Sequence, residues 1–162
     1  MTGHEALEKL LRAYGDYYNI ERDKPPFAAE AVFHSHEEQY FLVRSARIAE
    51  AESHEYVFFA QEGDLQADRL RELDAAAWNA GTARITPHHD HRSSDITLIV
   101  LAERIAPDAA ALIPKLRHYR SYFFGFQGWT HYQLCAADLS AERLFCNWQG
   151  RKLRKLIRAN LK

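Results

Sequence analysis

Apolar side chains near the amino terminus recur every three or four residues, which is the spacing of one face of an α-helix. Thr2 and Glu5 precede them in the S/T-x-x-E arrangement of a capping box, so an amphipathic helix is predicted over residues 3–18. A charged connection over residues 19–26 ends in two prolines. Aromatic and β-branched stretches then predict an antiparallel meander of three strands, at residues 28–34, 39–49 and 54–61.

Helical spacing returns in the middle of the chain. Asp64 suits an N-cap and Gly81 suits the position just after a last turn, which predicts a second helix between them. The apolar run Ile96–Ala102 is typical of a strand buried on both faces. A third helix is expected to open at Pro107 and to be interrupted at Pro114.

The last third of the chain is rich in aromatic residues. Residues 122–126 and 129–136 indicate one strand interrupted by glycine, or two strands across a turn. A short strand at residues 144–148 and a basic helix beginning near Gly150 complete the pattern. The predicted order is αβββαβαββα, an α+β fold with an antiparallel or mixed sheet in a single domain over residues 1–162.

Composition is consistent with one apolar core and an intracellular chain. Apolar residues make up 47% of the sequence, and no apolar run approaches the roughly 18 residues that a membrane span needs. The amino terminus lacks the basic and apolar regions of a signal peptide, so a cytoplasmic location without a membrane partner is expected. Cys135 and Cys146 lie in apolar surroundings and are predicted to be buried free thiols.

The net charge of −1 hides a segregation along the chain. Residues 143–162 carry seven basic side chains and no acidic one, which leaves 14 basic against 22 acidic side chains elsewhere, a balance of −8. Apolar residues of this basic tail form one helical stripe, and Lys152 and Lys155 lie outside it. Such a helix binds nucleic acid, lies on an anionic membrane or docks on its own acidic body, and the charge balance favours the last.

Several catalytic motifs are absent from the sequence. The seven glycines form neither a dinucleotide-binding loop nor a P-loop, and the motifs of serine hydrolases, zincins and EF-hands are missing. The predicted meander, helix and buried strand suggest the αβββαβ core of restriction-endonuclease-like nucleases. That chemistry needs carboxylates for Mg²⁺ and a lysine, yet no lysine occurs between Lys24 and Lys115, so a core of this type is expected to be inactive.

Two groups of histidines offer imidazole ligands for Zn²⁺ or another divalent metal. His34 and His36 share a face at the end of a predicted strand, whereas His88, His89 and His91 crowd a polar loop. Neighbouring loop residues seldom bind one ion together, so a solvated loop is the favoured interpretation. The sharper hypothesis is that the two groups converge in a metal site.

Basic and aromatic residues alternate over residues 115–129, in the manner of proteins that hold single-stranded nucleic acids. Candidate contacts with a ligand or nucleic acid are Arg117, Arg120, Tyr122, Phe124 and Trp129 in this stretch, with Lys152 and Lys155 in the tail. The stretch lacks the glycine and small residue of an RNP1 strand. Alternation places about half of the rings in the core, and packing is the favoured role.

Several segments together resemble a family of small bacterial proteins that share a domain of unknown function. They are Tyr40–Leu42, Ser45–Ile48, Glu55–Phe58, Pro87-His88, Ile96-Thr97, Tyr122–Trp129, Asn147 and Gly150–Leu153. The resemblance covers nearly the whole chain. It implies a compact domain and supplies neither an activity nor catalytic residues.

A small non-enzymatic binding domain is the function that these patterns favour, and no cofactor is established by them. We expect it to self-associate as a homodimer, or to bind another protein, through residues 119–129 and the basic tail. One alternative is a metal-binding protein or metal-dependent hydrolase that uses the histidines. Another is a nucleic-acid-binding domain with an inactive nuclease-like core, although nucleic acid is not the favoured partner.

Overall fold

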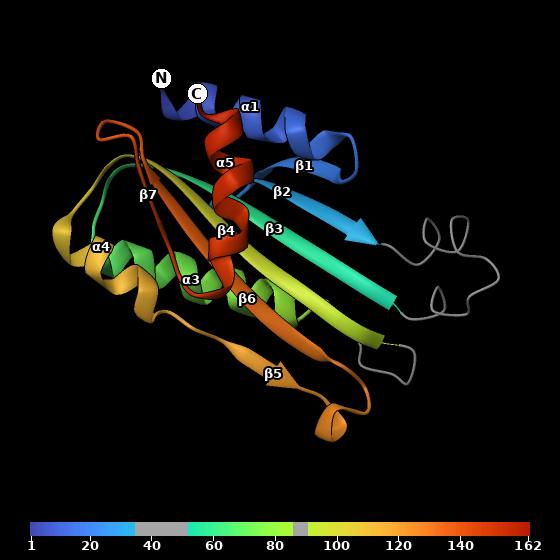
Figure 1. Cartoon of the computed structure of the whole chain (residues 1–162). Coiled ribbons are helices and arrows are strands. Elements are labelled where there is room, and N and C mark those ends of the chain that lie inside the picture. Colours follow the sequence, from blue (N-terminus) through green and yellow to red (C-terminus); the bar gives the residue numbers. More distant parts are fainter. Residues whose placement is uncertain (35–51, 86–90) are drawn as a thin grey trace.

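A mixed β-sheet forms the centre of the molecule in the computed structural model, which describes residues 1–34, 52–85 and 91–162 (Figure 1). In this part of the chain the strands are β1 (Asn19–Lys24), β2 (Phe27–His34), β3 (Glu52–Leu65), β4 (His91–Ile105), β5 (Tyr119–Ser121), β6 (Trp129–Asp138) and β7 (Arg143–Cys146). The sheet order is β1-β2-β3-β4-β6-β5, and β7 also pairs with β6. Strands β3, β4 and β6 run parallel to one another, whereas the other pairs are antiparallel.

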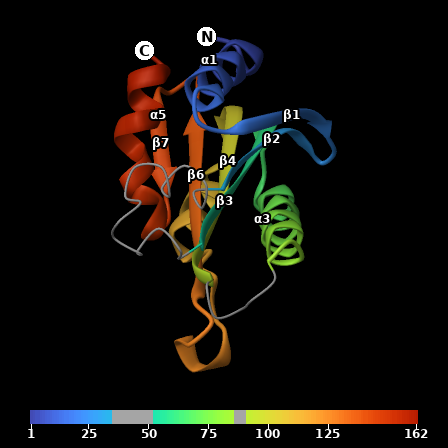
Figure 2. The same cartoon turned by 90° about the vertical axis from the view of Figure 1, so that its right-hand side faces the viewer.

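Helices cover both faces of the sheet. In the described residues they are α1 (Gly3–Gly15), α3 (Ala67–Thr82), α4 (Pro107–Leu112) and α5 (Arg154–Asn160), with short 3₁₀ turns η2 (Ile113–Lys115), η3 (Phe123–Gly125) and η4 (Gln149–Leu153). Figure 2 shows α5 and α3 on opposite sides of the sheet. The α+β fold class is therefore confirmed.

Alternation along the central strands divides the core into two layers. Phe58 and Leu98 point to the α3 and α4 side, and their neighbours Phe59 and Ile99 point to the α1 and α5 side. All four side chains are buried. This pattern explains why the central strands read as nearly continuous apolar runs, since both faces are covered.

The first helix follows its predicted start but ends earlier than expected. Thr2 and Glu5 form the reciprocal capping box, with hydrogen bonds of 2.9 and 3.1 Å. The helix stops at Gly15 rather than at residue 18. Residues 19–24, predicted as a connection, form edge strand β1, and its side chains are mostly exposed, so no apolar alternation marked it.

Both predicted ends of the second helix are wrong. Asp64 lies inside β3 and forms an ion pair of 2.7 Å with Arg104, while Gln66 is the N-cap of α3. Gly81 lies inside the helix instead of following it. A Cβ atom there would approach the Ile96 side chain to 2.6 Å, so glycine permits the close contact of α3 with the sheet.

The carboxyl-terminal half confirms some predictions and changes others. Helix α4 gives way to η2 at Pro114, as expected. Residues 122–126 form a turn rather than a strand, because Phe123 and Phe124 adopt left-handed backbone conformations that a strand does not contain. Cys135 and Cys146 are buried free thiols, as predicted. The strand predicted at residues 39–49 lies outside the described part.

Candidate functional site

A polar cleft interrupts the apolar layer beneath α1 and η4. Glu55 on β3 continues the row of Val57 and Phe59 on one face, and Asp95 and Gln133 occupy the same face of β4 and β6. Together with residues of α1, η4 and α5 they line a cavity of about 290 Å³, here called the carboxylate cleft. Its walls are Ala13, Tyr14, Tyr17, Tyr18, Glu55, Asp95, Gln133, Lys152, Leu153 and Leu156.

The strand register brings the two carboxylates together. Glu55 and Asp95 are direct partners in the parallel pairing of β3 with β4, so their side chains leave the sheet as neighbours. The Tyr18 hydroxyl donates a hydrogen bond to the Glu55 carboxylate. Burial raises the pKa of Glu55, the nearby Asp95 charge adds to this rise, and the Tyr18 hydrogen bond and Lys152 oppose it. Glu55 therefore holds a proton more readily than an exposed glutamate.

Tyr14 and Gln133 add two further polar groups to the cleft. Tyr14 is 4% exposed, and its hydroxyl has no hydrogen-bond partner among the described residues. Burial raises the pKa of this hydroxyl above its ordinary value, with Glu55 as a further cause, so it stays protonated at neutral pH. The Gln133 side-chain oxygen accepts a hydrogen bond of 3.4 Å from Thr97. The cleft thus contains donors and acceptors that a ligand would complete.

Residues 119–129 form an aromatic finger that projects from the sheet edge. Its neck is closed by hydrogen bonds of 2.9 Å from the Tyr122 amide to the Gly128 carbonyl, and of 2.8 Å between the Tyr122 and Thr130 hydroxyls. At its tip Phe123, Phe124 and Phe126 are 69%, 94% and 74% exposed. The predicted packing role is therefore wrong for these three rings.

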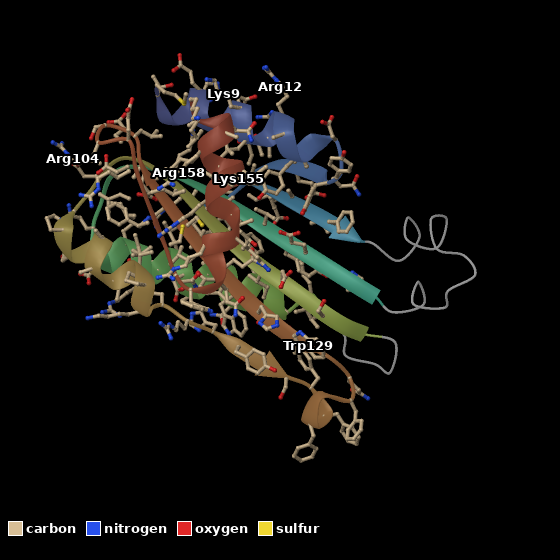
Figure 3. All side chains as sticks on the ribbon, viewed as in Figure 1. Lys9, Arg12, Arg104, Trp129, Lys155 and Arg158 are labelled. Atoms are coloured by element: carbon tan, nitrogen blue, oxygen red, sulfur yellow. The ribbon has the colours of Figure 1, made fainter. Side chains whose placement is uncertain are left out.

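The remaining candidate residues of this stretch flank the finger. Trp129 is partly exposed at its base and begins β6 (Figure 3). Arg120 lies on the edge strand β5, and Arg117 is exposed in the preceding segment, where its Nε donates to the Pro114 carbonyl at 3.4 Å. Basic and aromatic side chains thus lie along one edge of the sheet, and their contact with a ligand or nucleic acid stays a prediction.

The basic tail packs against the body through its apolar stripe. Ile157 is buried, and Leu153 and Leu161 pack beside it against the layer that contains α1. Lys152 and Lys155 are exposed, and within the described residues no basic side chain of the tail forms an ion pair with the body. Docking therefore rests on apolar contact rather than on the charge attraction that favoured it.

The structure describes only two of the five histidines proposed as metal ligands. His34 ends β2 and His91 begins β4, so their backbones lie at the same end of the sheet with β3 between them. His36, His88 and His89 lie outside the described residues. Among the residues described, no three His, Cys, Asp or Glu side chains are grouped to hold a metal ion. The convergence of the two histidine groups stays a prediction.

Sequence reasoning missed the carboxylate cleft. Its residues come from six elements and the α1–β1 turn, so no short motif contains them. One signal was present in the sequence. Glu55 stands two residues before the apolar Val57 and Asp95 stands four residues before the apolar Ile99, so strand alternation places each carboxylate on the same face as a buried residue. A carboxylate at an inward position of a buried strand needs a partner, and this marks a candidate site.

Comparison with known proteins identifies a family without an activity. A family profile described as "Domain of unknown function (DUF8052)" matches residues 2–159. No curated protein and no solved structure matches the chain. The resemblance to a domain family of unknown function is confirmed, while the bacterial origin stays a prediction. Within the described residues no helix is long and apolar enough to cross a membrane.

Proposed function

We propose that this chain, which belongs to the DUF8052 family of domains of unknown function, is a non-enzymatic interaction domain that self-associates through its aromatic finger. The observation that carries the proposal is the exposure of Phe123, Phe124 and Phe126 at the tip, between 69% and 94%. Exposed apolar side chains that gather at one place are typical of protein interaction sites.

The finger is suited to binding because it is already ordered. Its neck hydrogen bonds and its two left-handed phenylalanines fix the tip before a partner arrives. A preformed loop loses little conformational entropy on association. Burying one phenylalanine stabilises a complex by about 1.5–3 kcal/mol, so three rings supply enough for a measurable dimer.

A second copy of the chain is the partner that the surroundings of the finger favour. The finger follows β5, which lies at the outer edge of the sheet with all three residues exposed. An exposed edge strand accepts another strand in antiparallel pairing, and a twofold axis would place two fingers and two β5 edges against each other. The same surface thus serves both subunits.

Sedimentation over a range of protein concentrations tests this proposal. We expect a monomer–dimer equilibrium for the unaltered chain and a monomer for the triple variant F123S/F124S/F126S. The control is Trp148→Ser, which removes an aromatic ring of similar exposure, 62%, outside the finger. A chain that stays monomeric at all concentrations, or a triple variant that still dimerises, would contradict the proposal.

We also propose nucleic-acid binding on an inactive nuclease-like core as a second candidate. Supporting it are the order α1, β1, β2, β3, α3, β4 and the parallel pairing of β3 with β4, which fit an αβββαβ core. Four cations that form no ion pair within residues 1–34, 52–85 and 91–162 also favour it. Lys9 and Arg12 on α1 and Lys155 and Arg158 on α5 lie on helices that contact each other (Figure 3), and the Lys9 ammonium donates to the Lys162 carbonyl at 3.1 Å. Metal binding through the histidines remains the third alternative.

A further inference from the structure

The carboxylate cleft contains charged and polar side chains that have no part in self-association through the finger. It lies under α1 and η4, no residue of the finger lines it, and it holds charges of both signs: Glu55 and Asp95 on its floor and Lys152 on its wall. Apolar parts of Tyr17 and Leu156 complete the wall. A cavity with one apolar wall and a few charged groups has the composition of a small-molecule site.

The groups of the cleft do not satisfy one another. Glu55 accepts from the Tyr18 hydroxyl, but Asp95 has no hydrogen bond and no ion pair among the described residues. Two carboxylates at directly paired strand positions repel each other unless a cation or a proton lies between them. The buried Tyr14 hydroxyl is 4% exposed and has no hydrogen-bond partner in the part of the chain that the structure describes, which is a second and independent sign that a polar group is missing.

The arrangement of charges indicates what the missing group is. A compact positive group fits between Glu55 and Asp95, because both can accept its hydrogen bonds. Lys152 has no ion pair in the described part, and its charge, which also lowers the pKa of Glu55, is available to a negative group of a ligand. A simple metal ion would leave Lys152 and the apolar wall without a role. A ligand that is positive at one end and negative at the other uses both.

We infer that the cleft binds a small zwitterion of the α-amino-acid type with an apolar side chain. Its ammonium group lies between Glu55 and Asp95 and its carboxylate reaches Lys152. The apolar side chain rests against Tyr17 and Leu156. The Tyr14 hydroxyl, which is buried beside Glu55, completes the polar contacts.

The size of the cavity limits the ligand. At about 290 Å³ the cleft lies at the lower end of the range for ligand pockets, roughly 300–1,000 Å³. A single amino acid fits this space, whereas a nucleotide or a longer peptide would extend well beyond it. The inference is independent of the finger, because none of its residues belongs to residues 119–129.

Calorimetric titration with three probes of one shape tests the inference. L-leucine carries both charges, 3-methylbutylamine lacks the carboxylate, and 4-methylpentanoate lacks the ammonium group. We expect leucine to bind, the amine to bind about tenfold more weakly because the Lys152 contact is lost, and the carboxylate not to bind. An amine that binds as tightly as leucine, or leucine that releases no heat, would overturn the inference.

Variants locate the binding in the cleft. Glu55→Gln and Asp95→Asn should abolish leucine binding, and Lys152→Gln should reduce it to the level of the amine. Asp64→Asn is the matched control, since this exposed carboxylate on β3 pairs with Arg104 outside the cleft. Lys152 is exposed, so its variant is expected to fold and tests the assignment even if the buried changes disturb the sheet. Unaltered leucine affinity in Lys152→Gln would refute the zwitterion.

Discussion

At the scale of single residues, Asn147 shows how one side chain replaces a missing stretch of strand. On the side of β6 that faces away from β4, strands β5 and β7 pair with different parts of β6. The middle of β6 has no paired strand on that side. Asn147 fills this gap: its amide oxygen accepts from the Leu134 and Gly150 amides at 3.0 and 2.8 Å. Its amide nitrogen donates to the Leu116 and Tyr132 carbonyls at 2.9 and 3.3 Å. The buried backbone of β6 is thereby satisfied.

Removing this side chain should destabilise the protein strongly. In Asn147→Ala three buried backbone groups and one partly buried carbonyl lose their partner. Each buried unsatisfied group costs about 1–3 kcal/mol, so we expect a loss of at least about 3 kcal/mol in the free energy of unfolding. Urea denaturation measures this loss. Asn160→Ala is the control, because its side chain makes one exposed hydrogen bond, to Leu156. A loss below about 1 kcal/mol in Asn147→Ala would show that water replaces the bonds.

Residues 119–129 also show what a local pattern does not reveal about single side chains. The alternation of side chains predicted that about half of the rings would be buried, but side chains alternate between two faces only within a strand. Phe123 and Phe124 have φ angles of 48° and 54°, which turn the chain before alternation is established. Such left-handed conformations are uncommon for bulky residues, so propensity does not predict them.

At the scale of elements, helix α3 depends on close contact with the sheet. Gly81 is buried in its last turn and faces the fully buried Ile96 side chain. Alanine is the better helix former by about 1 kcal/mol, yet its Cβ would lie 2.6 Å from Ile96 atoms. Alanine at this position would therefore gain helix propensity but clash with Ile96. Because the surroundings are close-packed and yield little, we expect the cost of the clash to exceed the gain.

Gly81→Ala should consequently destabilise the protein by about 1–3 kcal/mol, as is typical of an overpacked core. The midpoint of thermal unfolding is a suitable measurement. Gly63→Ala provides the comparison, because a Cβ atom at Gly63 meets nothing within 4 Å and the change should be nearly neutral. Combining Gly81→Ala with Ile96→Val should restore part of the loss. A Gly81→Ala variant as stable as the original chain would mean that α3 shifts freely.

Elements with at least one buried face were predictable from the sequence, and those with none were not. The first helix, the central strands β3 and β4, and the break at Pro114 were found because apolar spacing or proline marks them. Edge strand β1 carries charged side chains on both faces, so its pairing with β2 decides its structure and no pattern shows it. The start of α3 was misplaced because β3 continues through Asp64, and its end was misplaced because Gly81 serves close packing on Ile96 inside the helix.

At the scale of the whole molecule, the carboxylate cleft exists only because distant segments meet. Tyr14, Glu55, Asp95, Gln133 and Lys152 are brought together by the parallel register of three strands and by the docking of the tail. Sequence spacing contains neither the register nor the docking direction. The charge segregation was visible in the sequence, but its consequence was not. Apolar contact holds the tail, and its cations form no ion pair with the described part of the body.

The cations of α1 and α5 allow a test of the second candidate function, nucleic-acid binding across the surface that these two helices form. Lys155→Gln with Arg158→Gln removes two cations of α5 that form no ion pair with any described residue, and Arg69→Gln with Arg104→Gln removes two cations that are paired with carboxylates. Both double variants change the net charge equally, so they separate a local surface from the total charge. If nucleic acid binds across α1 and α5, only the first pair should weaken it.

Fluorescence anisotropy with a labelled single-stranded oligonucleotide, measured over a series of salt concentrations, distinguishes the outcomes. Each phosphate neutralised should contribute about −0.7 to the slope of log affinity against log salt, so the α5 double variant should flatten the slope by roughly one unit or more. The paired-cation variant should keep the original slope. Equal weakening by both variants would reduce the effect to net charge. Binding that ignores salt would exclude phosphate contacts at this surface, because counterion release accompanies every such contact.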